Sequence, residues 1–200
     1  MKILSIALLV VLAVFLVLFV TLIGRRRLAQ RTTTVVPVPP LPTQTPGAVR
    51  FGPVEAVYVS TTLHGDWLAR VGAHGLGDRS HAAVTVHDTG VLIERDGADD
   101  LWVPVETIRS AGLAPGMAGK YVGTDGLVVL TWAVPEADGV APALVDTGLR
   151  TRLAEDRGSL VDAVRHLLAA TQPAQQSQQS QQHPEQQYPH QQYPHQQEAR

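Results

Sequence analysis

This chain contains no cysteine and few aromatic residues. Among its 200 residues there is no Cys, and Phe, Trp and Tyr together make up 5%. The absence of cysteine excludes disulfides and a cysteine nucleophile. It does not distinguish a cytosolic from an exported domain, because many exported domains also lack disulfides.

Sequence motifs for catalysis or nucleotide binding are also missing. No serine lies in a Gly-x-Ser-x-Gly elbow, and the glycines at 72–77 precede a strand-like pattern instead of the helix that a dinucleotide loop requires. The glycine-rich stretch 112–126 lacks the Gly-Lys-Ser/Thr ending of a phosphate-binding loop. We therefore predict no catalytic residue and no cofactor, and expect a protein that is not an enzyme.

Four histidines lie close together in the sequence without the spacing of a metal site. His64, His74, His81 and His87 are separated by ten, seven and six residues. These separations match neither the helical pair of a metalloprotease nor a zinc ribbon. We predict surface or turn histidines and no bound metal.

One long hydrophobic run stands at the start of the chain. Residues 3–23 are apolar except for Ser5 and Thr21. As a helix this run is ~31 Å long, about the thickness of the hydrocarbon core of a bilayer. It is longer than the apolar region of a signal peptide, and no small-residue cleavage site follows it. We predict an uncleaved, single-pass transmembrane anchor at residues 1–24.

Cations on the two sides of this run predict its orientation. Arg25, Arg26, Arg27 and Arg31 follow it, whereas only Lys2 and the amino terminus precede it. The positive-inside rule then places the C-terminal side in the cytoplasm and the protein in the cell membrane. We expect the four arginines to contact anionic lipid headgroups. An outward-facing envelope protein is the alternative.

The remaining residues divide into three segments of different composition. Residues 25–50 hold five arginines, five prolines and no acidic residue, which is typical of an extended spacer. Residues 51–170 have the composition of a globular domain, and residues 171–200 form a glutamine-rich tail that we expect to be disordered.

Charge is distributed unevenly between these segments. The predicted domain at 51–170 has nine basic and sixteen acidic residues, a net charge of −7, whereas the spacer carries +5. An acidic domain is repelled by nucleic acid and by anionic lipid. The strand pair at 82–96 has only Arg79 and Arg95 nearby, too few cations for a phosphorylated headgroup. We therefore expect the domain to bind a protein partner at the membrane and no nucleic acid.

The hydrophobic pattern of the predicted domain is that of a mainly β fold with one C-terminal helix. Short apolar or alternating runs bounded by turn residues predict strands at 54–62, 82–88, 91–96, 101–104, 107–113, 127–134 and 143–149. Ser159 is the predicted N-cap of the helix, with Asp162 as its capping-box partner. An apolar stripe on this helix is expected to cover the sheet; it consists of Leu160, Val164, Leu167 and Leu168.

Seven short strands followed by one helix is the element order of the pleckstrin-homology (PH) superfold. Several short segments resemble single-pass PH-like domain proteins of actinobacteria: DWLARV at 66–71, HGLG at 74–77, GMAGK at 116–120, GLVVLTW at 126–132 and DTGLR at 146–150. The resemblance implies a seven-stranded PH-like barrel or sandwich capped by the helix. Similar proteins are often described as transport proteins, but a single membrane helix is too little to form a transport path.

These observations favour a membrane-anchored binding or assembly module whose ligand and oligomeric state stay open. Trp67, Trp102 and Trp132 are interpreted as core or rim aromatics, and Trp67 is the possible partner-binding residue among them. The alternative from another class is an accessory subunit of a membrane transporter or enzyme complex.

Overall fold

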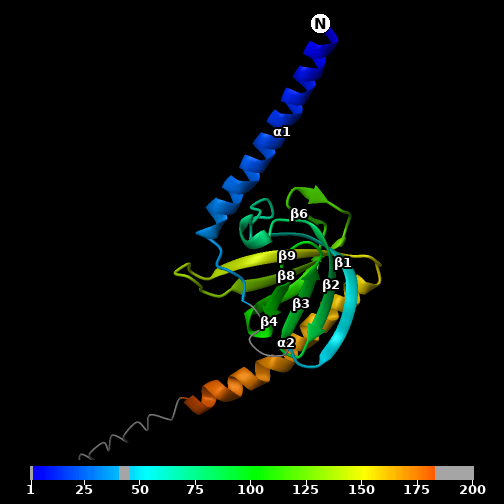
Figure 1. Cartoon of the computed structure of the whole chain (residues 1–200). Helices are drawn as coiled ribbons and strands as arrows, with labels where there is room; N and C mark the ends of the chain where they lie inside the picture. The colour runs from blue at the N-terminus through cyan, green and yellow to red at the C-terminus, as the bar shows by residue number, and fades with distance from the viewer. Residues whose placement is uncertain (1, 41–45, 183–200) are drawn as a thin grey trace, which may run out of the picture.

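The fold is built on one antiparallel sheet, with a helix before it and a helix after it in the sequence (Figure 1). This computed structural model describes residues 2–40 and 46–182, with side chains for residues 8–20, 24, 32–40 and 46–171. The elements are α1 (Lys2–Thr33), β1 (Val49–Leu63), η1 (Ala73–Gly75), β2 (Ser80–His87), β3 (Gly90–Arg95), β4 (Leu101–Pro104), η2 (Val105–Thr107), β5 (Ile108–Ala114), β6 (Gly116–Met117), β7 (Lys120–Tyr121), β8 (Leu127–Val134), β9 (Ala143–Thr151) and α2 (Asp156–Gln182).

The seven longer strands form a single sheet in the order β4-β3-β2-β1-β9-β8-β5. Each neighbouring pair is antiparallel. All seven predicted strands are present, and two of them, 101–104 and 127–134, have the predicted bounds. The short strands β6 and β7 form a separate hairpin between β5 and β8.

The sheet does not close into a barrel, which was one of the two predicted forms. Within the described residues the edge strands β4 and β5 do not pair with each other. The 3-10 turn η2 separates these two strands in the chain, and α2 packs against β5, β1, β8 and η2. Helix α2 therefore covers the side of the curved sheet that a barrel would close by pairing β4 with β5, as Figure 1 shows.

The core lies between the inner face of the sheet and α2. Trp132, Tyr58, Ile93, Leu130 and Leu149 are fully buried in it. On β2 the residues Ala82, Val84 and Val86 are buried as their alternation predicts. Alternating side chains of one strand point to opposite faces of a sheet, so this pattern fixes which face of β2 is inside.

Helix α2 presents the predicted apolar stripe to the sheet but begins earlier than predicted. Leu160, Val164 and Leu167 are buried in the core. Because the helix starts at Asp156, Ser159 lies inside it, where its hydroxyl donates to Glu155 O at 3.5 Å. The predicted N-cap role of Ser159, with Asp162 as its partner, is therefore wrong.

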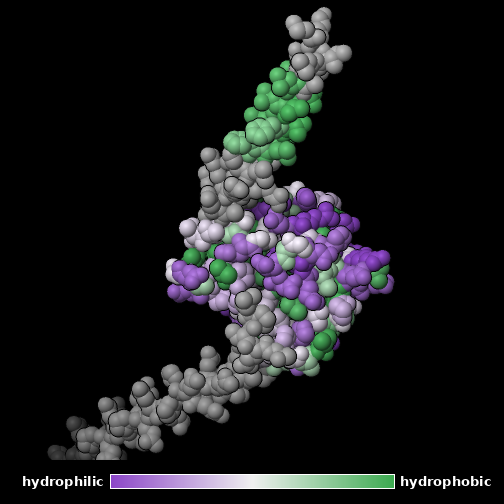
Figure 2. All heavy atoms as spheres, viewed as in Figure 1, coloured by the Kyte–Doolittle hydropathy of each residue, from purple (hydrophilic) through white to green (hydrophobic). Residues whose placement is uncertain are grey.

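Helix α1 carries the hydrophobic run and stands clear of the sheet (Figures 1 and 2). Residues 8–20 are all apolar, and their large side chains are exposed; Phe15 and Phe19 stack with ring centroids 6.2 Å apart. The hydrophobic run predicts a transmembrane helix in residues 1–24. Within the described residues, no helix meets the combined requirements of length and hydropathy for a membrane crossing.

The predicted spacer and tail both contain helix. Residues 25–33 continue α1, and β1 begins at Val49, so the irregular part of the predicted 25–50 spacer is shorter than expected. At the other end, α2 extends to Gln182, which makes the first part of the predicted disordered tail helical. Residues 183–200 lie outside the described residues.

Replacement of Leu167 by alanine tests whether α2 completes the core. This side chain is 1% exposed, so Leu167→Ala should lower the free energy of unfolding by about 2 to 5 kcal/mol in chemical denaturation. The matched control is Leu153→Ala, at a side chain 51% exposed, which should change stability by less than about 0.5 kcal/mol. Equal effects of the two substitutions would show that α2 does not cover the core.

Candidate functional site

The end of α1 is fastened to a loop of the domain. The Thr32 hydroxyl oxygen accepts hydrogen bonds from the backbone N–H groups of Gly72 and Ala73, at 3.1 and 2.8 Å. Just beyond the helix, Val36 is fully buried in the main core, and its carbonyl accepts a bond from His74 Nε2 at 3.1 Å. We call these contacts the helix junction, and they set the direction in which α1 leaves the domain.

A chain of buried hydrogen bonds connects the core to the loop that binds the end of α1, the β1–β2 connection at residues 64–79. Trp132 Nε1 donates to the Thr147 hydroxyl, which contacts the Thr61 hydroxyl at 2.8 Å; that hydroxyl in turn contacts the Tyr58 hydroxyl at 2.6 Å. The Tyr58 hydroxyl donates to Leu76 O at 2.9 Å. Because a hydroxyl has one proton to donate, the donation runs in one direction, from Trp132 through to Leu76.

Arg95 secures the same loop from the side. Its guanidinium donates from Nη1 to Gly75 O at 2.9 Å and from Nε to Asp99 O at 2.6 Å, and it lies over the Tyr58 ring at 4.8 Å from the centroid. Only 6% of Arg95 is exposed. Hydrogen bonds to two carbonyl groups and the contact with the ring face offset the free-energy cost of burying this cation.

Three exposed side chains stand on two adjoining loops beside the junction. Trp67, Leu68 and Tyr121 are 55%, 61% and 73% exposed, and we call them the aromatic surface. The loops are joined by a hydrogen bond from Ala118 N to Trp67 O at 2.8 Å. Trp67, predicted as a possible partner-binding residue, is thus exposed, whereas Trp102 and Trp132 are buried.

The β6–β7 hairpin that carries Tyr121 is held against the sheet by Met117. This side chain is 3% exposed and packs with Val59 and Leu127. A Cβ on Gly148 would lie 2.7 Å from its sulfur, so β9 needs a glycine at this position for Met117 to pack there. The β6–β7 hairpin is therefore packed against β1 and β8 through Met117.

A second feature is a hollow of about 400 Å³ on the face of β1, β2 and β9 that points away from the main core. We call it the basic hollow; its charged lining residues are Arg79, His81, Arg150, Arg152 and Glu55. Val57 on β1 pairs with both His81 and Arg150, which places these side chains in one row across the three strands. Arg152 forms an ion pair with Glu55, leaving Arg79 and Arg150 as the cations of the hollow with no recorded partner in the described part of the chain.

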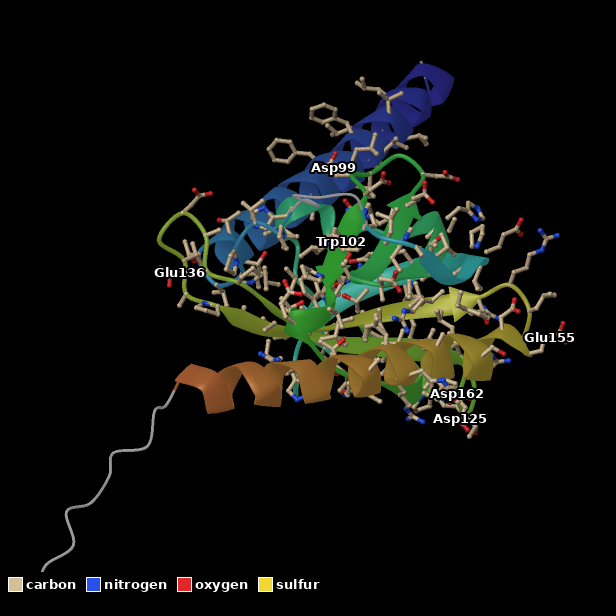
Figure 3. All side chains as sticks on the ribbon, turned by 90° about the horizontal axis from the view of Figure 1, so that it is seen from below. Asp99, Trp102, Asp125, Glu136, Glu155 and Asp162 are labelled. Carbon is tan, nitrogen blue, oxygen red and sulfur yellow. The ribbon has the colours of Figure 1, made fainter. Side chains whose placement is uncertain are left out.

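Acidic residues lie on several sides of the domain. Asp99, Glu136 and Glu155 lie at separate edges of the domain in Figure 3. Three of the nine basic residues in 51–170, by contrast, line the one hollow. This hollow therefore gives an acidic domain a local site of opposite sign, where an anionic group would be attracted.

Comparison with protein families agrees with this architecture. A family model described as bacterial PH domain-like matches residues 35–165, more than half of the chain. The chain belongs to the bacterial PH-like family. The matched segment begins next to Val36, whose buried side chain ties the N-terminal segment to the core. No curated protein matches the chain.

The other predicted sites of the PH-like protein have different outcomes. The side chains of Arg25, Arg26, Arg27 and Arg31 lie outside the described ones, so their lipid contact stays a prediction. In the part of the chain with described side chains, no three His, Asp or Glu residues are placed to hold a metal ion.

The basic hollow does not follow from the adjacent strand pair 82–96, because its cations come from strands that are far apart in the sequence. The strand pair 82–96 offers few cations, but β1 lies between β2 and β9 and brings Arg79 and His81 beside Arg150 and Arg152. The Arg-Thr-Arg alternation at 150–152 was the available signal, because it places two arginines on one face of a strand.

The buried hydrogen-bond chain predicts a specific pH dependence of stability. Burial raises the pKa of Tyr58 to about 12, although the hydrogen bond with Thr61 and the charge of Arg95 act in the opposite direction. An unfolded tyrosine titrates near pH 10. Between about pH 10 and 12 the unfolded chain therefore loses this proton while the folded domain keeps it, so the free energy of unfolding should fall with rising pH.

Tyr58→Phe isolates this contribution. Below pH 10 the variant should lose about 1 to 3 kcal/mol, because Leu76 O and Thr61 each lose a hydrogen-bond partner. Above pH 10 its stability should fall less steeply than that of the unmodified chain, as measured by urea unfolding across the pH series. Parallel curves for the two proteins would contradict a neutral, buried Tyr58.

Proposed function

We propose that this protein is a binding or assembly module that α1 holds at a membrane. Its membership of the bacterial PH-like family supports a binding or assembly role. The observation that carries the membrane part is the exposed apolar surface of α1 together with its fixed junction to the domain. An anchor joined in this way would present the domain in one orientation.

An apolar environment around α1 would explain why its hydrophobic side chains are exposed. From Leu8 to Val20, each large hydrophobic side chain is at least 52% exposed, on every side of the helix. A helix that is hydrophobic all round belongs in the core of a large protein or in a lipid bilayer. The run extends over residues 3–23 in the sequence, ~31 Å of helix, which matches the bilayer hydrocarbon thickness.

The proposed location is the cell membrane, with the PH-like domain on the cytoplasmic side. Arg25, Arg26, Arg27 and Arg31 support this orientation through the positive-inside rule, and they would contact anionic headgroups. The resemblance to single-pass proteins of actinobacteria agrees with this arrangement.

We propose that the domain's partner is a protein that offers an acidic segment to the basic hollow. Arg79 and Arg150 are exposed cations, spaced across three strands, so separate carboxylates of a peptide could each pair with one of them. Glu55 in the same hollow disfavours a compact, doubly charged group more than it disfavours dispersed single charges.

Orientation is tested with a single cysteine, because the chain has none of its own. Leu153→Cys places the thiol at a site 51% exposed. A membrane-impermeant maleimide should label it only after the cells are permeabilised, and the protein should stay with the membrane fraction in alkaline carbonate. Labelling in intact cells would support the outward-facing alternative, and release by carbonate would contradict the anchor.

Binding at the hollow is tested with a fluorescent polyglutamate peptide and the full chain in detergent. Each of Arg79→Gln and Arg150→Gln should weaken binding about two- to fivefold, the effect of losing an exposed ion pair of ~0.5 to 1 kcal/mol. Arg109→Gln is the matched control: it makes the same charge change on β5, outside the hollow, and should leave binding nearly unchanged. Equal losses in all three variants would indicate a general charge effect and no site.

A further inference from the structure

We propose that the aromatic surface, formed by Trp67, Leu68 and Tyr121, rests in the headgroup layer of the bilayer that α1 enters. The domain would then touch the membrane at a second place besides its helix. This inference rests on the proposed membrane attachment, and the experiment below separates a failure of one from a failure of the other.

The aromatic surface and the helix junction share one loop. The β1–β2 connection at residues 64–79 carries Trp67 and Leu68, and four residues after Leu68 it supplies the Gly72 N–H that binds Thr32. Tyr121 joins them through the hairpin bonded to Trp67 O. The hairpin stands at the end of the domain from which α1 rises (Figure 1). A membrane around α1 would therefore lie on this side of the domain.

The length of α1 between its apolar run and the junction sets the distance to the membrane. Thr32 is nine positions after Ile23, so the junction lies ~14 Å along the helix from the edge of the hydrocarbon. The headgroup layer occupies roughly 5 to 8 Å of this distance. Side chains that project toward the membrane from the loop and the hairpin would reach the headgroups and stop short of the hydrocarbon.

The chemistry of the aromatic surface suits that layer. Tryptophan and tyrosine concentrate at membrane interfaces because each has an apolar ring and a polar group. Lys120 beside Tyr121 is exposed and can reach anionic headgroups. Asp66, directly before Trp67 in the same loop, accepts hydrogen bonds from the backbone N–H groups of Leu68 and Ala69 at 3.0 and 3.2 Å. A protein partner would have to enter between this surface and the membrane to cover it.

Environment-sensitive labels on single cysteines test the proposal in the full chain, reconstituted in liposomes of neutral and anionic phospholipid. Leu68→Cys and Tyr121→Cys report on the aromatic surface, and Val17→Cys reports on α1. Leu153→Cys is the matched exposed control: it lies two residues after Thr151, which pairs with Ala56 in the middle of β1, away from the end of β1 where the loop begins. Each variant is first compared with the unmodified chain in thermal unfolding.

The labels at 68 and 121 should show a blue-shifted emission relative to 153, and a lipid with a shallow spin label should quench them. The label at 17 should be quenched most by a deep spin label. If 17 responds to lipid but 68 and 121 match 153, the helix is anchored and the aromatic surface does not touch the membrane. If 17 also matches 153, the membrane attachment itself is wrong.

Discussion

The buried hydrogen-bond chain from Trp132 to Leu76 is the constraint on which the rest of this structure depends. It crosses β8, β9 and β1 and ends at the loop that receives the end of α1. Every hydroxyl along it both donates and accepts, so loss of one member leaves buried neighbours without a partner. Arg95 fixes the other side of the same loop. The core therefore determines where the helix attaches, and the helix direction follows from the strands.

This attachment places two surfaces of the domain differently relative to α1. The aromatic surface lies next to the helix junction, on the loop that the hydrogen-bond chain supports. The basic hollow lies on the flank formed by β1, β2 and β9, where an acidic domain gathers three of its arginines. A domain held at one angle to a membrane would keep the first surface toward lipid and the second open to a partner approaching from the side. The acidic remainder of the surface disfavours close contact with anionic lipid elsewhere.

Sequence periodicity was sufficient for the seven strands of the main sheet, because alternation on β2 and the apolar run on β8 follow directly from which faces are buried. It did not predict the short strands β6 and β7. It was not sufficient for the helix start, since Ser159 has the residue type of an N-cap but lies one turn inside α2. Nor did it predict the open edge between β4 and β5, which depends on how α2 packs. The helix junction and the basic hollow combine residues far apart in sequence, such as Thr32 with Gly72 and His81 with Arg150, so they required the fold.

A distance measurement across the helix junction tests this account most directly. Spin labels at Val17→Cys and Leu153→Cys, one on α1 and one on the domain, report the distance between the two sites in a pulsed electron paramagnetic resonance experiment. The width of the distance distribution shows how firmly α1 is held relative to the domain. A single narrow distance distribution is predicted, and it should broaden when Thr32→Val removes the acceptor of the Gly72 and Ala73 bonds. A distribution that is already broad, and unchanged by Thr32→Val, would contradict a domain held in one orientation by its core.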